Sequence, residues 1–133
     1  MASIITRLSL RSKNLFSNAL SARHDKVTAV KTDADRRVKT IKEASGAPAI
    51  LIDATEYYSA GTETVFIFIK NKTTIADKYL YIKIGTQLAF KLKPGAYTVF
   101  PWYVASASID VNIYSNDATA GVQVEYFAVE ETT

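Results

Sequence analysis

The segment TVFIFIK, residues Thr64–Lys70, decides the fold class of this chain. Branched apolar residues at positions 65, 67 and 69 alternate with Phe66 and Phe68. Successive side chains of a β-strand point to opposite faces, so both faces of this strand are apolar and need cover. The pattern predicts a central strand whose second face lies under the N-terminal segment or a loop, or else at an interface between subunits.

Similar short runs of β-branched and aromatic residues follow one another along the chain, separated by turn signals. The expected strands are Ala49–Ala54, Thr64–Lys70, Tyr79–Ile84, Leu88–Leu92, Tyr97–Tyr103, Ile109–Tyr114 and Val122–Val129. Their connections are too short for βαβ crossovers, and Pro94-Gly95 fits the centre of a type II turn. The sequence therefore predicts an all-β fold, an antiparallel β-sandwich of jelly-roll-like type.

The faces of the other strands indicate which side packs inward. Leu80, Ile82 and Ile84 share one face, opposite Tyr79 and Tyr81. By the same alternation, the inward residues of the last two strands are Ile109, Val111, Ile113, Val122, Val124 and Tyr126. Aromatic residues are enriched at the centres of interfaces. We therefore expect self-association, as a trimer or ring, through an outer aromatic band of Phe66, Phe68, Tyr79, Tyr81 and Phe127.

Charge is unevenly distributed along the chain. Residues 1–48 hold ten Lys and Arg against four Asp and Glu, whereas residues 49–133 hold six against nine, and the first 24 residues contain no carboxylate. Such asymmetry indicates a basic arm on a mildly acidic body. We predict an arm at residues 1–37 and a β-sandwich domain at residues 38–133. The residues expected to dock the arm on a partner are Ile4, Ile5, Arg7, Leu8, Arg11, Lys13, Leu15, Phe16 and Arg23.

Residues 21–48 fit two structures. Apolar residues at 27, 30, 34, 38 and 41 recur at helical spacing, and Gly46 and Pro48 would end such a helix. Alternatively, KVTAV and RRVKTIK form two short strands joined by a turn at TDAD. The frequent Val and Thr favour extended structure.

The Arg- and Ser-rich start is also typical of a mitochondrial presequence, but it lacks the continuous apolar stretch of a secretory signal. No apolar run of the chain approaches the ~18–20 residues of a membrane span. We interpret the segment as an arm that binds a partner, and we expect no membrane association.

Few residues are suited to catalysis. The chain has no cysteine and a single histidine, His24, which lies outside the predicted β-domain. A catalytic triad would have to use this histidine, and a zinc site needs three or four ligands, so both kinds of site are improbable on these residues. The acidic residues Asp53, Glu56, Glu63, Asp110 and Glu125 are scattered. We expect them to solvate the outer sheet faces, a glycosidase-like pair being the alternative. No glycine motif for phosphate occurs. We predict no enzymatic activity, no cofactor, no metal and no specific nucleic-acid partner.

A second group of aromatic residues allows two interpretations. Its members are Tyr57, Tyr58, Tyr97, Phe100, Trp102 and Tyr103. They could form a platform on which sugars stack. The favoured interpretation is that Trp102, which follows a proline, anchors a strand in the core.

Three stretches resemble small β-sandwich structural proteins of tailed-bacteriophage virions. They are VFIFIKN (Val65–Asn71), KLKPGAYTVFPW (Lys91–Trp102) and VQVEYFAVE (Val122–Glu130). The shared features are a strand ending in Lys-Asn, a Pro-Gly turn before an aromatic-Pro-Trp strand, and a final Val/Glu/Tyr strand. The resemblance covers about residues 38–130.

This resemblance implies a non-enzymatic protein located in the virion. The most direct expectation is a capsid decoration, or cement, protein that binds the major capsid protein or another virion protein. A tail or head-tail neck accessory protein is the alternative. The rival classes are a carbohydrate-binding module and an organellar protein with a transit peptide.

Overall fold

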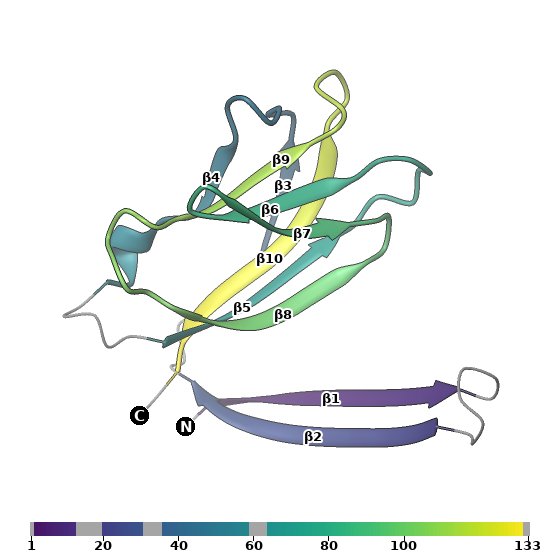
Figure 1. The fold of residues 1–133 in the computed structure, drawn as a ribbon, viewed down its shortest axis with the longest axis vertical. Coiled ribbons are helices and arrows are strands. Elements are labelled where there is room, and N and C mark those ends of the chain that lie inside the picture. Colours follow the sequence, from purple (N-terminus) through teal and green to yellow (C-terminus); the bar gives the residue numbers. More distant parts are fainter. Residues whose placement is uncertain (1, 13–19, 31–35, 59–63, 132–133) are drawn as a thin grey trace. The chain divides into compact units, whose positions relative to one another are not determined.

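The computed structural model describes residues 2–12, 20–30, 36–58 and 64–131 (Figure 1). The chain divides into two compact units, Met1–Thr32 with Glu131–Thr133, and Asp33–Glu130. The first contains a two-stranded hairpin and the second contains two four-stranded sheets. The predicted all-β sandwich is confirmed. The division between the units falls before the predicted end of the arm at residue 37.

The N-terminal unit is an antiparallel hairpin of β1 (Ala2–Ser12) and β2 (Leu20–Val30). Its register runs without a break from Ala2 opposite Val30 to Ser12 opposite Leu20. KVTAV lies in β2, and RVKTI forms β3 (Arg37–Ile41). The extended alternative for this region is therefore confirmed for the described residues. These two strands pair with different partners rather than with each other.

The predicted strands of the sandwich lie within two residues of the observed ones. The described strands after β3 are β4 (Ala49–Ile52), β5 (Thr64–Asn71), β6 (Leu80–Ile84), β7 (Gln87–Leu92), β8 (Tyr97–Tyr103), β9 (Val111–Ser115) and β10 (Val122–Glu130). The Pro94-Gly95 turn is also confirmed. The Ala96 N–H donates to the Lys93 carbonyl over 2.9 Å, and Gly95 has the positive φ of +77° that a type II turn requires.

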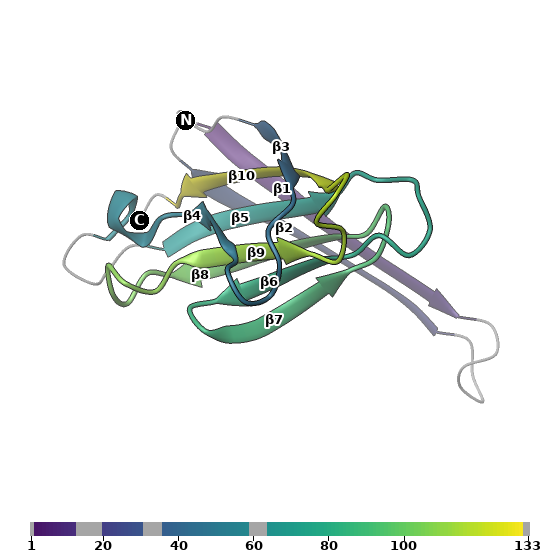
Figure 2. The ribbon, with the colours of Figure 1, turned by 90° about the horizontal axis from the view of Figure 1, so that it is seen from above.

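The strand order is that of a jelly roll. One sheet has the order β3-β10-β5-β8, and the other has the order β4-β9-β6-β7 (Figures 1 and 2). The pairs β6·β7, β5·β8, β4·β9 and β3·β10 nest inside one another along the chain. The sandwich is thus one long antiparallel hairpin, centred on the β6–β7 turn, whose successive strand pairs fall alternately into the two sheets.

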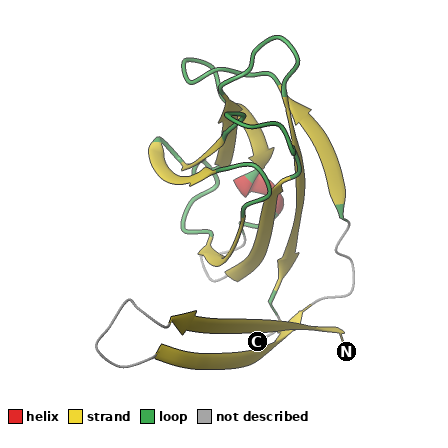
Figure 3. Ribbon diagram, turned by 90° about the vertical axis from the view of Figure 1, so that its right-hand side faces the viewer, coloured by secondary structure: helices red, strands yellow, loops and turns green. Residues whose placement is uncertain are grey.

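The core lies between these two sheets. β5 is a central strand, as predicted, and its inward residues Val65, Ile67 and Ile69 are fully buried. The predicted inward position of Ile109 is wrong. Its N–H closes a turn onto the Ser106 carbonyl, β9 begins only at Val111, and the side chain is 37% exposed. A single 3₁₀ turn, η1 (Ala54–Glu56), is the one helical element among the described residues (Figure 3).

Gly121, where β10 begins beside β3, offers a test of this packing. Its φ is +77°, and a Cβ there would lie 2.6 Å from the Thr40 side chain and 3.0 Å from the Ile41 carbonyl oxygen. Alanine would be strained in this left-handed backbone conformation, and its Cβ would also overpack against β3. Because the two costs add, we expect Gly121→Ala to lower the free energy of unfolding by about 2–4 kcal/mol. Gly46→Ala is the matched control, since no atom lies within 4 Å of its added Cβ. Chemical denaturation that gives equal effects for both changes would contradict this packing.

Candidate functional site

The outer face of the β3-β10-β5-β8 sheet carries a continuous layer of apolar side chains. In the register, Phe68 of β5 lies opposite Phe127 of β10 and Val99 of β8. Paired residues of an antiparallel sheet share a face, so side chains from three strands meet on the side away from the core. We call this surface the outer aromatic face. Its members are Phe66, Phe68, Tyr97, Val99, Tyr103 and Phe127.

Four rings of this face stack on one another across the strands. The ring centroids of Phe68 and Phe127 are 5.3 Å apart, with the planes at 17°. Phe127 also stacks on Phe66 at 6.3 Å, and Phe68 stacks on Tyr97 at 6.2 Å. Such pairs contribute about 0.5–1.5 kcal/mol each beyond the burial of their area. The rings therefore form one ladder that crosses β8, β5 and β10.

The rim of the outer aromatic face is open to solvent. Tyr97 is 64% exposed, Tyr103 is 58% exposed and Val99 is 37% exposed, whereas Phe66 is only 7% exposed. Phe66 is therefore already covered within this chain, and the accessible apolar surface comes largely from β8. The outward position of these β8 residues could have been inferred from the sequence. Once Trp102 is placed in the core, alternation puts residues 97, 99 and 103 of the same strand on the outer side.

Tyr79 and Tyr81 lie elsewhere, so the single aromatic band predicted from the sequence is wrong in this respect. Tyr81 belongs to β6 of the second sheet, and Tyr79 directly precedes that strand. Tyr81 stacks on Tyr114 of β9 with the ring centroids 4.7 Å apart, and the Lys91 ammonium lies 4.4 Å from the ring centroid of Tyr79. Alternation tells which residues share a face of one strand, but not which strands share a sheet.

The predicted docking residues that the structure describes lie on both strands of the hairpin. Ile5 is 57% exposed and Arg7 is exposed, whereas Ile4 is half-buried. Leu8, Arg11 and Arg23 lie within β1 and β2, and Lys13, Leu15 and Phe16 lie outside the described residues. The single histidine, His24, stands opposite Leu8 in the register. The docking role of these residues stays a prediction.

Two of the scattered carboxylates hold the start of η1 instead of solvating a sheet face. Asp53 accepts hydrogen bonds from the hydroxyl and the N–H of Thr55 over 2.6 and 2.8 Å. These bonds, the hydroxyl first, hold the pKa of the Asp53 carboxyl below its usual range. Asp110 accepts a hydrogen bond from the Ala54 N–H over 2.8 Å. Both carboxylates are thus committed to local structure.

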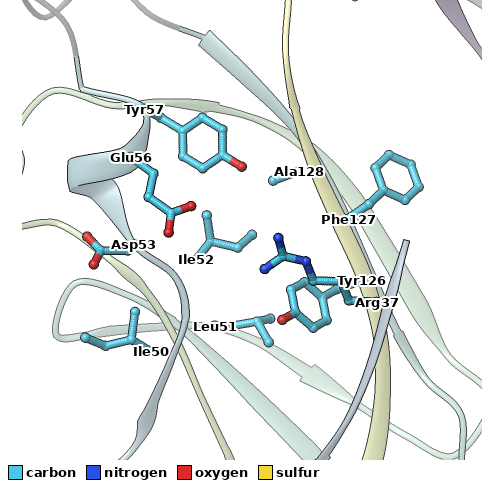
Figure 4. Close-up of a pocket in the computed structure, with 10 residues that line it drawn as sticks. All are labelled: Arg37, Ile50, Leu51, Ile52, Asp53, Glu56, Tyr57, Tyr126, Phe127 and Ala128. Atoms are coloured by element: carbon cyan, nitrogen blue, oxygen red, sulfur yellow. The ribbon is translucent and has the colours of Figure 1, made fainter. Parts of the chain in front are cut away.

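Glu125 also departs from the prediction of a solvated carboxylate. Its side chain is buried, and it forms an ion pair with Arg36 over 2.5 Å, which fastens the start of β3 to β10. Glu63 lies outside the described residues. Glu56 is exposed, and Figure 4 shows its carboxylate directed into a hollow of about 380 Å³ that is also lined by Arg37 and Tyr126.

The prediction that Trp102 anchors the core is confirmed. Trp102 is 4% exposed and meets the ring of Tyr57 edge-on, with the centroids 6.5 Å apart. Phe100 packs against the same core. The rings of Phe68 and Phe127 are too close to lie side by side in one plane, so their faces are turned toward each other. This arrangement differs from a flat platform for a sugar ring.

No model of a known protein family matches this sequence, and no curated protein matches it. Within the described ranges, no three His, Cys, Asp or Glu side chains are grouped so that they could hold a metal ion. The described part also contains no helix long and apolar enough to cross a membrane.

Proposed function

We propose that this chain is a non-enzymatic structural protein that assembles in many copies, as a capsid decoration protein of a tailed-phage virion. The outer aromatic face is the observation that carries the proposal. A sheet with one solvated face normally alternates between apolar and polar residues, whereas β8 exposes Tyr97, Val99 and Tyr103 beside a ladder of stacked rings. A contiguous apolar patch of this kind marks an interaction surface.

The N-terminal hairpin supports a docking role. It forms a compact unit separate from the sandwich, and its first strand belongs to a basic segment without carboxylates. Such a segment is attracted to an acidic surface. We assign this surface to the major capsid protein or another virion protein, which places the chain in the virion. A tail or neck accessory role uses the same surfaces and differs only in the partner.

The jelly-roll fold is compatible with this proposal but does not by itself distinguish it from other functions. Jelly rolls occur in viral capsid proteins, lectins and cupins, and a fold hosts many functions. The virion is favoured by the sequence resemblance. A carbohydrate-binding module is less well supported, because the exposed tyrosines border rings that stack on one another.

Copurification with the tagged full-length chain from its natural source tests the proposal. We expect large particles that contain many copies of the chain in a fixed ratio to one major protein. A variant lacking residues 1–32 keeps the Arg36–Glu125 ion pair and all of β3, so it should remain folded but be lost from the particles. Recovery of the full-length chain with glycans alone would contradict the proposal, and full occupancy by the truncated chain would contradict the docking role.

A further inference from the structure

The outer face of the β4-β9-β6-β7 sheet carries a row of side chains that crosses three strands. The register places Tyr81 of β6 opposite Tyr114 of β9 on one side and opposite Lys91 of β7 on the other. Paired residues of an antiparallel sheet share a face. The chain neighbours Ile82 and Ile113 are fully buried in the core, so alternation directs Tyr81 and Tyr114 outward.

One face of the Tyr114 ring is left without an aromatic or cationic partner in this row. The rings of Tyr81 and Tyr114 lie at 7° with their centroids 4.7 Å apart, so each covers one face of the other. The Lys91 ammonium lies 5.7 Å from the centroid of the Tyr81 ring, and Lys91 and Tyr114 come from strands on opposite sides of β6. Tyr81 is therefore covered on both faces, whereas no described ring or cation covers the second face of Tyr114.

A hollow of about 400 Å³ lies beside this tyrosine pair, and we call it the tyrosine hollow. Besides Tyr81 and Tyr114, its lining includes Ala44 and Ser45 of the loop before β4, and Asn116 and Ala118 of the loop after β9. The Ser115 N–H donates to the Glu43 carbonyl over 2.9 Å and joins the two loops. The loop residues of the lining have short side chains, which leaves the space beside the rings open.

The lining of the tyrosine hollow carries no charge. Among the residues that the structure describes, no Lys, Arg, Asp or Glu belongs to it. The nearest acidic residue in the sequence, Asp117, is already paired with the Lys78 ammonium over 2.8 Å. A charged ligand would therefore lose its hydration without gaining a counter-charge from the lining, and the hollow favours a neutral one.

The same lining offers several unused hydrogen-bonding groups. The hydroxyls of Ser45, Tyr81 and Tyr114 make no hydrogen bond with another residue in the described part of the chain. The Asn116 amide donates once to the Asp77 carbonyl and accepts once from the Tyr79 N–H. An amide has two N–H groups and two lone pairs, so one of each remains. The hollow thus combines an aromatic face with neutral donors and acceptors.

We propose that the tyrosine hollow binds a neutral saccharide. The C–H side of a sugar ring packs on the second face of Tyr114, and the sugar hydroxyls, which both donate and accept, pair with the unused groups of the lining. The volume is near the low end of the about 300–1,000 Å³ of ligand pockets, which suits a short saccharide. This inference goes beyond the proposed function. The two are compatible, because the hollow and the outer aromatic face belong to different sheets of the sandwich.

An array of neutral and sialylated oligosaccharides, probed with the labelled full-length chain, tests this assignment. The array displays each saccharide in many copies, so that weak binding is detected through multivalency. We expect binding to at least one neutral saccharide, whose affinity is then measured by isothermal titration calorimetry. Tyr114→Leu keeps an apolar contact for Tyr81 but removes the ring face, so it should weaken binding by about threefold to tenfold.

A second variant fills the hollow without touching the core. Ala118 is exposed, so Ala118→Trp adds an indole to the lining while the protein stays folded, and binding should weaken at least about tenfold. Ala107→Trp is the matched control. Ala107 is also an exposed alanine, but it precedes β9, whereas the hollow lies at the other end of that strand. Its variant should bind as the wild type does, and circular dichroism checks that both variants are folded.

Equal binding by the Ala118→Trp and Ala107→Trp variants would overturn the proposal. Binding of sialylated saccharides alone, or of no saccharide, would also overturn it. A loss of oligomer in the Ala118→Trp variant would assign the hollow to a contact between protein chains, with the same consequence. A chain that assembles but binds no saccharide refutes only this inference, whereas a chain that binds a neutral saccharide and stays monomeric refutes only the proposed function.

Discussion

Asn71→Ala is expected to lower the free energy of unfolding by about 3–5 kcal/mol, the largest effect of a single side chain predicted for this sandwich. The Asn71 side chain is fully buried at the end of β5. Its Nδ2 donates to the carbonyls of Lys78 and Leu92, both over 3.0 Å, and its Oδ1 accepts from the Thr73 N–H over 3.1 Å. Alanine leaves these three backbone groups without that partner, at about 1–3 kcal/mol for each group that stays buried.

Asn116→Ala is the matched control for this change. Asn116 also makes two hydrogen bonds to backbone, with the Asp77 carbonyl at 2.7 Å and the Tyr79 N–H at 2.8 Å, but it is exposed. Water replaces the lost partner there, so we expect a cost of at most about 1 kcal/mol. Urea denaturation of both variants measures the difference. A cost for Asn71→Ala no greater than that for Asn116→Ala would mean that Asn71 does not hold the end of the sandwich together.

The double change Tyr97→Ser and Val99→Ser is expected to weaken self-association by about tenfold to a hundredfold and leave the monomer folded. Both side chains are exposed on the outer aromatic face. Covering a whole exposed side chain contributes about 1.5–3 kcal/mol, so covering the exposed parts of these two contributes about 1.5–3 kcal/mol in total. About 1.4 kcal/mol corresponds to a tenfold change in affinity and about 2.8 kcal/mol to a hundredfold change. Phe66 is a poor choice for this test, because it is 7% exposed and its loss would destabilise the monomer.

Leu88→Ser provides the control, since Leu88 is 55% exposed but belongs to the second sheet. Sedimentation velocity should show the wild-type distribution for Leu88→Ser and a shift to monomer for the double variant. Circular dichroism checks that both stay folded. An unchanged oligomer in the double variant would place the interface elsewhere on the molecule.

Local features of this fold could be predicted from the sequence because they depend on neighbouring residues. Alternation in TVFIFIK identified a two-sided, central strand, and β5 lies between β10 and β8. Gly95 tolerates the positive φ of its turn, and Trp102 after a proline lies in the core. Each of these inferences depends on sterics or periodicity within a few residues.

The pairing of distant strands could not be predicted in the same way. β3 pairs with β10, which is about 80 residues later in the sequence, and no local sequence pattern identifies β10 as its partner. The same limitation produced the error over Tyr79 and Tyr81, because nothing local assigns β6 to the sheet opposite β5. The hollow lined by Arg37 and Glu56 was missed for a related reason, since these two residues come to line one space only in the folded chain.

The mass of the intact full-length chain in solution tests most directly whether this protein assembles in many copies. Native mass spectrometry over a range of protein concentrations measures it without a label. We predict a discrete oligomer, a trimer or a closed ring, that dissociates on dilution and in the Tyr97→Ser, Val99→Ser double variant. A mass equal to one chain at every concentration would contradict the account, because the outer aromatic face would then have no second copy to cover it.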